Sequence, residues 1–333
     1  MRARRAWAAL LAAVALAAAL SPLIGAVPVP PAELVRAALD PAAADPAAVR
    51  ILALRLPRLV LGLAAGAALA LAGAAFQTLL GNPLATPYTV GVASAGAFGA
   101  FLVLATSTGT AGGAAPQAAA LAASTAELLL LAALARRARW GRTAVVLAGV
   151  VLNFLFASGT VLVRLLADPF ALRAMDRWLL GGLGVVGWEA PARAVALGLP
   201  AAAVLLAAAA PLDQIALGDA LAHGRGVPVA WWRAAVLVAG AWLTAAVVAQ
   251  TGPIAFVGLL VPHGVRAVMG PAHRRVLPAS ALAGAGFLVA ADALARAIPL
   301  PGGGSELPVG VVTALAGGPA FLALLVGATA PRR

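Results

Sequence analysis

Side chains that could perform chemistry are scarce in this 333-residue sequence, and the missing types are as informative as the ones present. There is no cysteine, so disulfides, thiolate nucleophiles and cysteine-bound metals are excluded. All 23 positive charges are arginine, and a chain without lysine cannot carry an ordinary Walker A phosphate loop. The three histidines, His223, His263 and His273, cannot form an HExxH motif. The sequence therefore predicts no catalytic residue, no metal site and no cofactor.

Two acids lie within strongly apolar segments, Glu127 and Asp292. Arg296 follows Asp292 by four residues, one helical turn, which favours an ion pair between them. A structural pair and a functional one are both open, because charged residues inside a membrane are costly and often functional. A proton-coupled transporter generally carries more buried carboxylates, so Glu127 by itself is thin support for one.

Arg55-Leu56-Pro57-Arg58 places two arginines three residues apart, on one face of a helix, with Pro57 suited to the first helical turn. Their guanidinium groups could contact lipid head groups. They could also dock carboxylates of an external partner.

Asn82-Pro83-Leu84-Ala85-Thr86-Pro87 contains two prolines four residues apart, which prevent a smooth helix. Irregular backbone near a membrane is tolerated where it is packed in protein or lines a wet cavity, so this turn is a packed corner or part of a gate. The amides of Gln77 and Asn153 are equally open, because buried amides can join helices or face a wet pathway.

The elements that must position these residues are membrane spans. The chain is 63% hydrophobic and only 10% charged, with a mean hydropathy of +1.01, so it cannot bury its apolar surface in a water-soluble fold. Ten spans are predicted, at 6–27, 59–80, 88–108, 114–135, 143–166, 191–210, 230–250, 253–268, 276–297 and 306–329. The first could be taken for a signal peptide, but its apolar run continues and nine further spans follow, which favours retention.

Charge sets the predicted orientation. Ten spans place both termini on one side, and with that side inside, 14 of the 23 arginines lie inside and 9 outside. The net charge of +12 is therefore attributed to topology rather than to nucleic-acid binding. The longest polar stretches are 28–58, 167–190 and 211–229. The last predicts one or two short helices on the cytoplasmic face.

Several motifs, in order and spacing, resemble the permease subunits of iron-siderophore, haem and cobalamin ABC importers (the FecCD type), over about residues 50–325. The first matches are Arg55-Leu56-Pro57-Arg58, Gly73, Gln77, Asn82 to Pro87 and Gly91, followed by Trp178 to Gly182 and Trp188. The later ones are Gly252 to His263, Arg266, Gly270, His273-Arg274, Asp292 with Arg296, Glu306 to Gly310, Gly318-Pro319 and Phe321.

The resemblance implies an all-α polytopic membrane protein, a single permease domain over 1–333, with spans 2–5 and 7–10 as inverted repeats. Two permease subunits would pair, as a homodimer or a heterodimer. Two ATPase subunits would bind on the cytoplasmic side and an extracytoplasmic binding protein on the other. The protein would lie in the bacterial plasma membrane with both termini in the cytoplasm, as a transport subunit rather than an enzyme. It would import a ferric siderophore or similar chelate.

Family roles transfer to matching positions of this sequence. Docking of the binding protein would fall to Arg55, Arg58 and Arg296. Coupling to the ATPase would fall to the loop 211–229, with Leu217, Gly218, Asp219, Ala220 and Gly226. The pathway and gate would include Asn82, Leu84, Arg142, Thr143 and Asn153.

Two other function classes are weighed beside this one. A stand-alone ion-coupled secondary transporter would also use repeats and broken helices. An intramembrane hydrolase would need a Ser–His pair, and neither Ser94 nor Ser158 has a convincing partner. The pathway gives no chelate-specific signature, so siderophore, haem and cobalamin all stay open.

Overall fold

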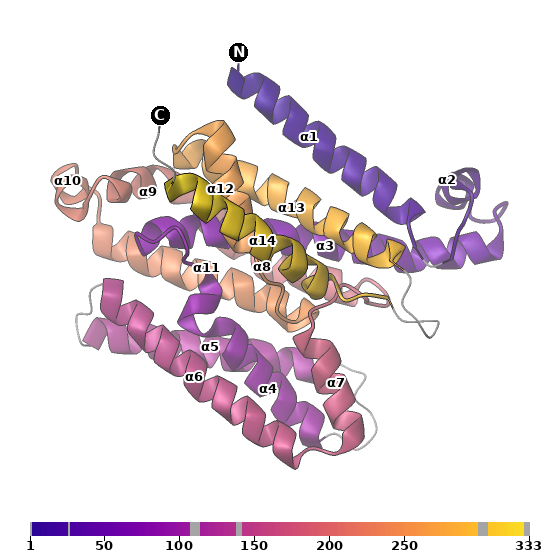
Figure 1. Ribbon diagram of the computed structural model, residues 1–333, viewed down its shortest axis with the longest axis horizontal. Helices are drawn as coiled ribbons and strands as arrows, with labels where there is room; N and C mark the ends of the chain where they lie inside the picture. The colour runs from indigo at the N-terminus through magenta and orange to yellow at the C-terminus, as the bar shows by residue number, and fades with distance from the viewer. Residues whose placement is uncertain (1, 26, 107–113, 138–141, 299–305, 330–333) are drawn as a thin grey trace.

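The structure is a computed structural model that describes residues 2–25, 27–106, 114–137, 142–298 and 306–329 (Figure 1). Side chains are described for all of these except 2–3, 135–137, 142–143 and 324–329. The described residues form helices joined by turns and contain no strand, which confirms the predicted all-α class.

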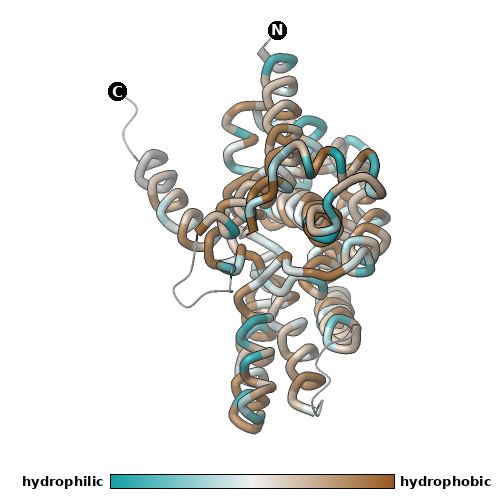
Figure 2. The backbone as a smooth tube through the Cα atoms, turned by 90° about the vertical axis from the view of Figure 1, so that its right-hand side faces the viewer, coloured by the Kyte–Doolittle hydropathy of each residue, from teal (hydrophilic) through white to brown (hydrophobic). Residues whose placement is uncertain are grey.

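Ten helices carry the apolar segments, and they match the ten predicted spans. They are α1 (Arg2–Leu20), α3 (Pro46–Leu79), α4 (Val92–Thr106), α5 (Ala115–Arg137), α6 (Arg142–Leu166), α8 (Glu189–Ala207), α11 (Val229–Thr251), α12 (Val257–Met269), α13 (His273–Ala297) and α14 (Val309–Thr329). In the described chain seven of them are long and apolar enough to cross a membrane, while α4, α12 and α14 offer shorter apolar stretches. Hydrophobic residues accordingly dominate the helices in Figure 2, with hydrophilic residues in short bands.

The remaining helices are short and lie mainly at the two ends of the bundle. They are η1 (Ser21–Leu23), α2 (Pro31–Leu39), η2 (Pro87–Val90), α7 (Pro169–Leu179), α9 (Ala209–Ala216) and α10 (Asp219–Gly224). Figure 1 shows α9 and α10 at one end of the long axis and α2 at the opposite end. The predicted short helices of the 211–229 stretch are thus confirmed as α9 and α10, and the polar stretch 167–190 contains a helix, α7.

Helix α3 begins much earlier than the span predicted at 59–80. Asp45 caps it by accepting a hydrogen bond from the Ala47 backbone N–H at 2.9 Å, and Pro46 occupies the first turn. Pro57 therefore lies inside the helix, and its expected place in a first turn is wrong. At 34 residues, α3 is about 50 Å long, well beyond the hydrocarbon thickness of about 30 Å.

Helices α3 and α13 form an antiparallel pair at the centre of the fold. They cross at Gly66 and Gly284, where a Cβ atom on either residue would lie 2.1–2.2 Å from the carbonyl oxygen of the other. No side chain fits there, so these two glycines serve the close packing of the helices at this crossing. The same two helices also meet through polar residues near both ends of the stretch over which they pair, described below.

The packing of the two halves is reciprocal, as the predicted repeats require. Helix α3 packs on α12 and α13, and α11 packs on α4 and α5. In each half the short helix starts directly after a residue with left-handed backbone: Gly91 (φ 100°) precedes α4, and Phe256 (φ 67°) precedes α12. A non-glycine residue in that region is uncommon. The Phe256 ring lies against Gly317 of α14, where a larger residue would clash.

Candidate functional site

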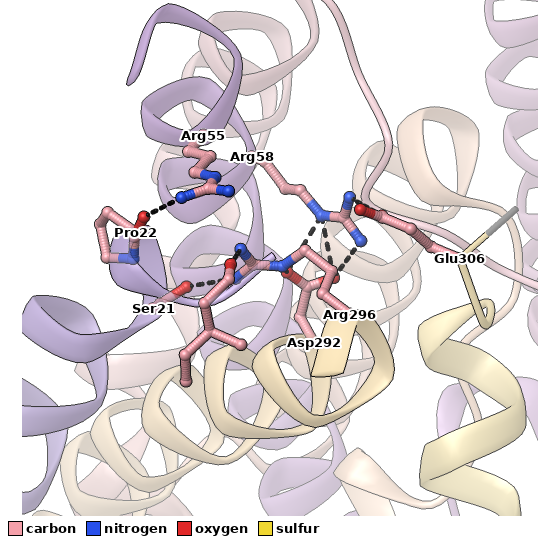
Figure 3. A network of polar contacts seen from close by, with 8 residues as sticks. Ser21, Pro22, Arg55, Arg58, Asp292, Arg296 and Glu306 are labelled. Carbon is pink, nitrogen blue, oxygen red and sulfur yellow. Dashed lines mark hydrogen bonds and ion pairs between the residues drawn. The ribbon is translucent and has the colours of Figure 1, made fainter. Parts of the chain in front are cut away.

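The first group of polar residues is the outer cluster: Arg58, Asp292, Arg296 and Glu306 (Figure 3). Arg58 donates from Nε to both oxygens of Asp292 at 3.0 Å and from Nη2 to Oδ1 at 2.8 Å, while its Nη1 bonds the Glu306 carboxylate. Arg296 donates from Nε to the second Asp292 oxygen at 3.0 Å. Asp292 thus lies between two guanidinium groups, and it joins α3 to α13.

The segment formed by residues 21–25 and 27, which follows α1, contacts this cluster and Arg55. Arg296 donates to the Ser21 hydroxyl at 2.7 Å and to the carbonyl three residues further on. Arg55 donates to two other carbonyls of the segment, at 2.7 Å each. The cluster and Arg55 together hold three cations against two acids, so one positive charge is balanced only by backbone dipoles.

Burial makes these ion pairs consequential. The side chains of Asp292 and Arg296 are 3% and 4% exposed, Arg58 is 14% exposed, and Glu306 is 35% exposed. Removal of one partner from a buried pair leaves an uncompensated charge, which typically costs about 3–5 kcal/mol. Both acids are held by arginine, so neither is free to ligate a metal.

The expected pair between Asp292 and Arg296 is confirmed. The three arginines predicted to dock a binding protein are brought together here, but their guanidinium groups already bond within the chain, and docking itself stays a prediction. The partnership of Arg58 with Asp292 and Glu306 was missed. The sequence did offer one signal for this pair: Asp292 is an acid near the end of an apolar span, and Arg58 is an arginine assigned to the same side of the membrane.

The second group is the inner cluster: Asp213, His273 and Thr78, near the other ends of α3 and α13. His273 is buried, with Nδ1 2.6 Å from Asp213 Oδ1 and Nε2 2.6 Å from the Thr78 hydroxyl. The same Asp213 oxygen accepts the His273 backbone N–H at 2.8 Å, which places a carboxylate at the N-terminus of α13. This cluster connects α9, α13 and α3, and sequence reasoning missed it.

Arg266 of α12 adjoins the inner cluster. Its guanidinium bonds the side-chain oxygen of Gln77 and the carbonyl of Ala74 at 2.9 Å, near the C-terminal end of α3, where a cation is favourable. Gln77 in turn donates to the Leu259 carbonyl at 3.2 Å. Gln77 therefore joins α3 to α12. It also lines an open pocket of about 500 Å³, together with Arg266 and His263.

The turn at 80–86 is irregular, as predicted. Asn82 is exposed and its side chain accepts the Leu84 backbone N–H at 2.9 Å, a local turn that needs no helix. Further along, the Tyr88 hydroxyl donates to the Ile254 carbonyl at 3.1 Å, so the broken segments of the two halves touch. A gate role for Asn82 and Leu84 stays a prediction.

The predicted coupling segment 211–229 has one face buried against the bundle and one exposed face. Leu212 and Ile215 are fully buried against the bundle, whereas Leu217 and Leu221 are 58% and 54% exposed. The other predicted coupling residues, Asp219, Ala220 and Gly226, are exposed, and Gly218 is half-buried. Asp219 pairs with Arg233 of α11 at 2.6 Å.

Helix α6 holds the remaining predicted pathway residues. Asn153 is half-buried, while Arg142 and Thr143 lie where side chains are not described. An apolar face of this helix is open, with Phe154 68% and Leu155 62% exposed. A helix this apolar and this uncovered needs lipid or a second subunit beside it.

Glu127 of α5 is the one buried acid outside both clusters in the described part of the chain. It is 1% exposed, and neither of its oxygens has a hydrogen-bond partner among the described residues. Its Oε1 lies beside Gly91, at the start of α4.

Comparison with known proteins gives consistent matches across the chain. The model of the FecCD transport family matches residues 5–327. An uncharacterized ABC transporter permease protein, YvrB of Bacillus subtilis, is 39% identical over 82% of this chain and 77% of its own length. The vitamin B12 import system permease protein BtuC of Salmonella typhimurium is 36% identical over 82% of each chain.

A solved structure has the same fold. It is the inward-facing conformation of a transporter assigned to the metal-chelate type of ABC transporters, with a TM-score of 0.85 and 27% identity. The similarity covers 97% of this chain and 99% of the other.

Proposed function

Because this chain belongs to the FecCD transport family and is an ABC importer permease subunit of the bacterial inner membrane, we propose that it carries a ferric siderophore or a similar metal chelate into the cytoplasm. The match over residues 5–327 is the observation that carries the proposal. The solved neighbour belongs to the metal-chelate type, and a relative imports vitamin B12, a cobalt chelate. Metal chelates are therefore the cargo class that these similarities support.

ATP would be hydrolysed on a separate chain. The absence of lysine excludes an ordinary Walker A loop here, so nucleotide chemistry requires ATPase partners. The exposed face of α9 and α10, with Leu217 and Leu221, is our proposed contact for them. Such a contact would put the 211–229 stretch and both termini in the cytoplasm, the orientation that the arginine count also predicts.

The binding protein would dock at the opposite end, near the outer cluster. Arg55 lies beside this cluster and bonds only backbone carbonyls, with no ion pair to a described acid, so its charge is open to a carboxylate of the binding protein. Arg58 and Arg296 would contribute by shifting part of their bonding from Asp292 and Glu306 to incoming carboxylates. Substrate would then pass along the open face of α6, beside Asn153, with the turn at Asn82 and Leu84 near the exit.

The test is transport into proteoliposomes that contain this permease, its ATPase and its binding protein. The probes are a hydroxamate ferric siderophore, haem and vitamin B12, each labelled with a metal isotope. We expect ATP-dependent uptake of at least one metal chelate and none without the ATPase. Uptake driven by an ion gradient through the permease alone would contradict the proposal and favour a secondary transporter. Uptake of B12 alone would retain the function and replace the siderophore as cargo.

A further inference from the structure

The inner cluster is the point where the 211–229 segment is tied to the central helix pair by side-chain hydrogen bonds. Asp213 belongs to α9, His273 is the first residue of α13, and Thr78 lies in the last turn of α3. The two imidazole contacts are short, at 2.6 Å each, and they lie on opposite nitrogens of one ring. A single planar group thus spans the gap between α9 and α3.

We infer that the Asp213–His273–Thr78 contacts transmit the movement of α9 and α10 to the end of α3 and to the turn at 80–86. This inference rests on the proposed coupling role of the 211–229 segment. The three residues would act as positioning residues, because none of them lies on the exposed face of α9 and α10 or in the turn itself.

The geometry favours joint movement. His273 is 4% exposed, so a nitrogen that lost its partner would be left without a hydrogen bond in a buried place, which is costly. Asp213 is additionally bound to the backbone of α13 at 2.8 Å. A displacement of α9 therefore takes His273 with it, and the ring takes the Thr78 hydroxyl.

Thr78 is also well placed to pass the displacement on. The turn with Asn82 and Leu84 starts two residues after it, and Arg266 of α12 lies 3.5 Å from the same hydroxyl. Arg266 and Gln77 then connect α3 to α12. One hydroxyl thus adjoins the link to α9, the irregular turn and α12.

A simple packing anchor would account for the same contacts, and it makes a different prediction. If the cluster only fastens α9 to the bundle, loss of the Thr78 hydroxyl lowers stability and leaves the response to ATP intact. If the cluster transmits movement, loss of the bond between Thr78 and His273 abolishes the response to ATP at the turn 80–86 and preserves the response at α10. The experiment therefore needs one label on α10 and one in the turn at 80–86.

The chain has no cysteine, which allows single fluorescent labels without background. One label goes on Leu221→Cys in α10, which is 54% exposed, and the other on Leu84→Cys in the turn, which is 44% exposed. The labelled permease is assembled with its ATPase in nanodiscs, and the spectral change on addition of ATP and vanadate is recorded. In the parent chain both labels should respond.

In Thr78→Val the response at α10 should persist while the response at the turn falls about fivefold or more, the lower range of typical coupling between sites. Thr78→Ser, which restores the hydroxyl, should restore the turn response. Thr244→Val is the matched control, because Thr244 is buried and its hydroxyl bonds only the Gly240 carbonyl of its own helix at 2.9 Å.

Two results would overturn the inference, and they differ in what they reject. A full response at Leu84→Cys in Thr78→Val would reject transmission through the inner cluster and leave the proposed function standing. A parent chain that assembles with its ATPase but shows no response at Leu221→Cys would reject the coupling role of the 211–229 segment itself.

Discussion

The two ends of the α3–α13 pair are held by different chemistry. The outer cluster consists of charges, with Asp292 bound by two arginines through bonds of 2.8–3.0 Å. The inner cluster consists of an imidazole that meets one carboxylate and one hydroxyl. Arg58 and Thr78 are twenty residues apart on α3, so the clusters lie about 30 Å from each other, the thickness of a bilayer core.

The difference implies a rigid connection between the helices at the outer end and a weaker connection, which permits movement, at the inner end. At the outer end several bonds share each charge, and loss of one group leaves a buried ion, so the two helices are held rigidly. At the inner end each ring nitrogen of His273 makes one hydrogen bond, with a net contribution of about 0.5–1.5 kcal/mol to the neutral hydroxyl and about 1.5–3 kcal/mol to the carboxylate. An arrangement that is strong at one end and modest at the other permits movement where α9 attaches. Three changes test this contrast, and a fourth tests a buried acid outside both clusters.

Asp292→Asn should have the largest effect, because it leaves Arg58 and Arg296 buried without a full counter-charge. We expect a loss of about 3–5 kcal/mol in stability, measured by thermal or denaturant unfolding in detergent. Glu306→Gln is the control, since Glu306 is 35% exposed and should cost about 1 kcal/mol or less. Equal losses of stability in the two variants would mean that Asp292 does not make the main contribution to the outer cluster.

His273→Leu should lower stability less, by about 1–3 kcal/mol. It removes a hydrogen-bond partner from the Asp213 carboxylate and the Thr78 hydroxyl, but it leaves no buried guanidinium group without a counter-charge. The same unfolding measurement applies. His263→Leu serves as control, since His263 is exposed and should change stability little. If His273→Leu proves as damaging as Asp292→Asn, the two ends do not differ in strength.

Arg55→Glu tests whether the outer end is also a docking surface. We expect the affinity of the binding protein to fall about tenfold, near 1.4 kcal/mol, as a cation that faces carboxylates is reversed. Surface plasmon resonance on nanodiscs measures it, and the effect should shrink as salt is raised. Arg36→Glu is the control: the predicted topology places Arg36 on the same side as Arg55, but Arg36 is paired with Glu33 in α2. Similar losses in both variants would indicate a general charge effect.

Glu127→Met should have the smallest effect and the opposite sign. Its oxygens have no partner among the described residues, so removal of the carboxyl should raise stability by about 1 kcal/mol. Gln77→Met is the matched change at an amide that bonds Leu259 and Arg266 of α12, and it should lower stability. A destabilised Glu127→Met would show that this carboxyl has a partner that sequence and packing do not reveal.

Much of the fold could be predicted from the sequence, because hydropathy is a local property. Each of the ten apolar helices coincides with a predicted span to within a few residues, except at the end of α1, which stops at Leu20 instead of 27, and at the start of α3. That boundary was missed because residues 46–58 carry three arginines and two prolines, which suggested a polar stretch, whereas alanine, leucine and the Asp45 cap favour a helix.

The candidate site was predictable only where its partners are close in sequence. Asp292 and Arg296 are one turn apart, and their pair was expected. Arg58 and Asp292 are separated by 234 residues, and Thr78 and His273 by 195, so no periodicity could connect them. These contacts depend on the antiparallel packing of α3 and α13, which a single sequence does not encode in any local pattern.

One consequence follows from the unbroken length of α3. Because a single 34-residue helix carries a residue of both clusters, a state that changes its position at one membrane surface changes it at the other. Thermodynamic linkage then works in both directions: if ATP binding inside weakens the grip on the binding protein by some factor, docking of that protein weakens ATP binding by the same factor.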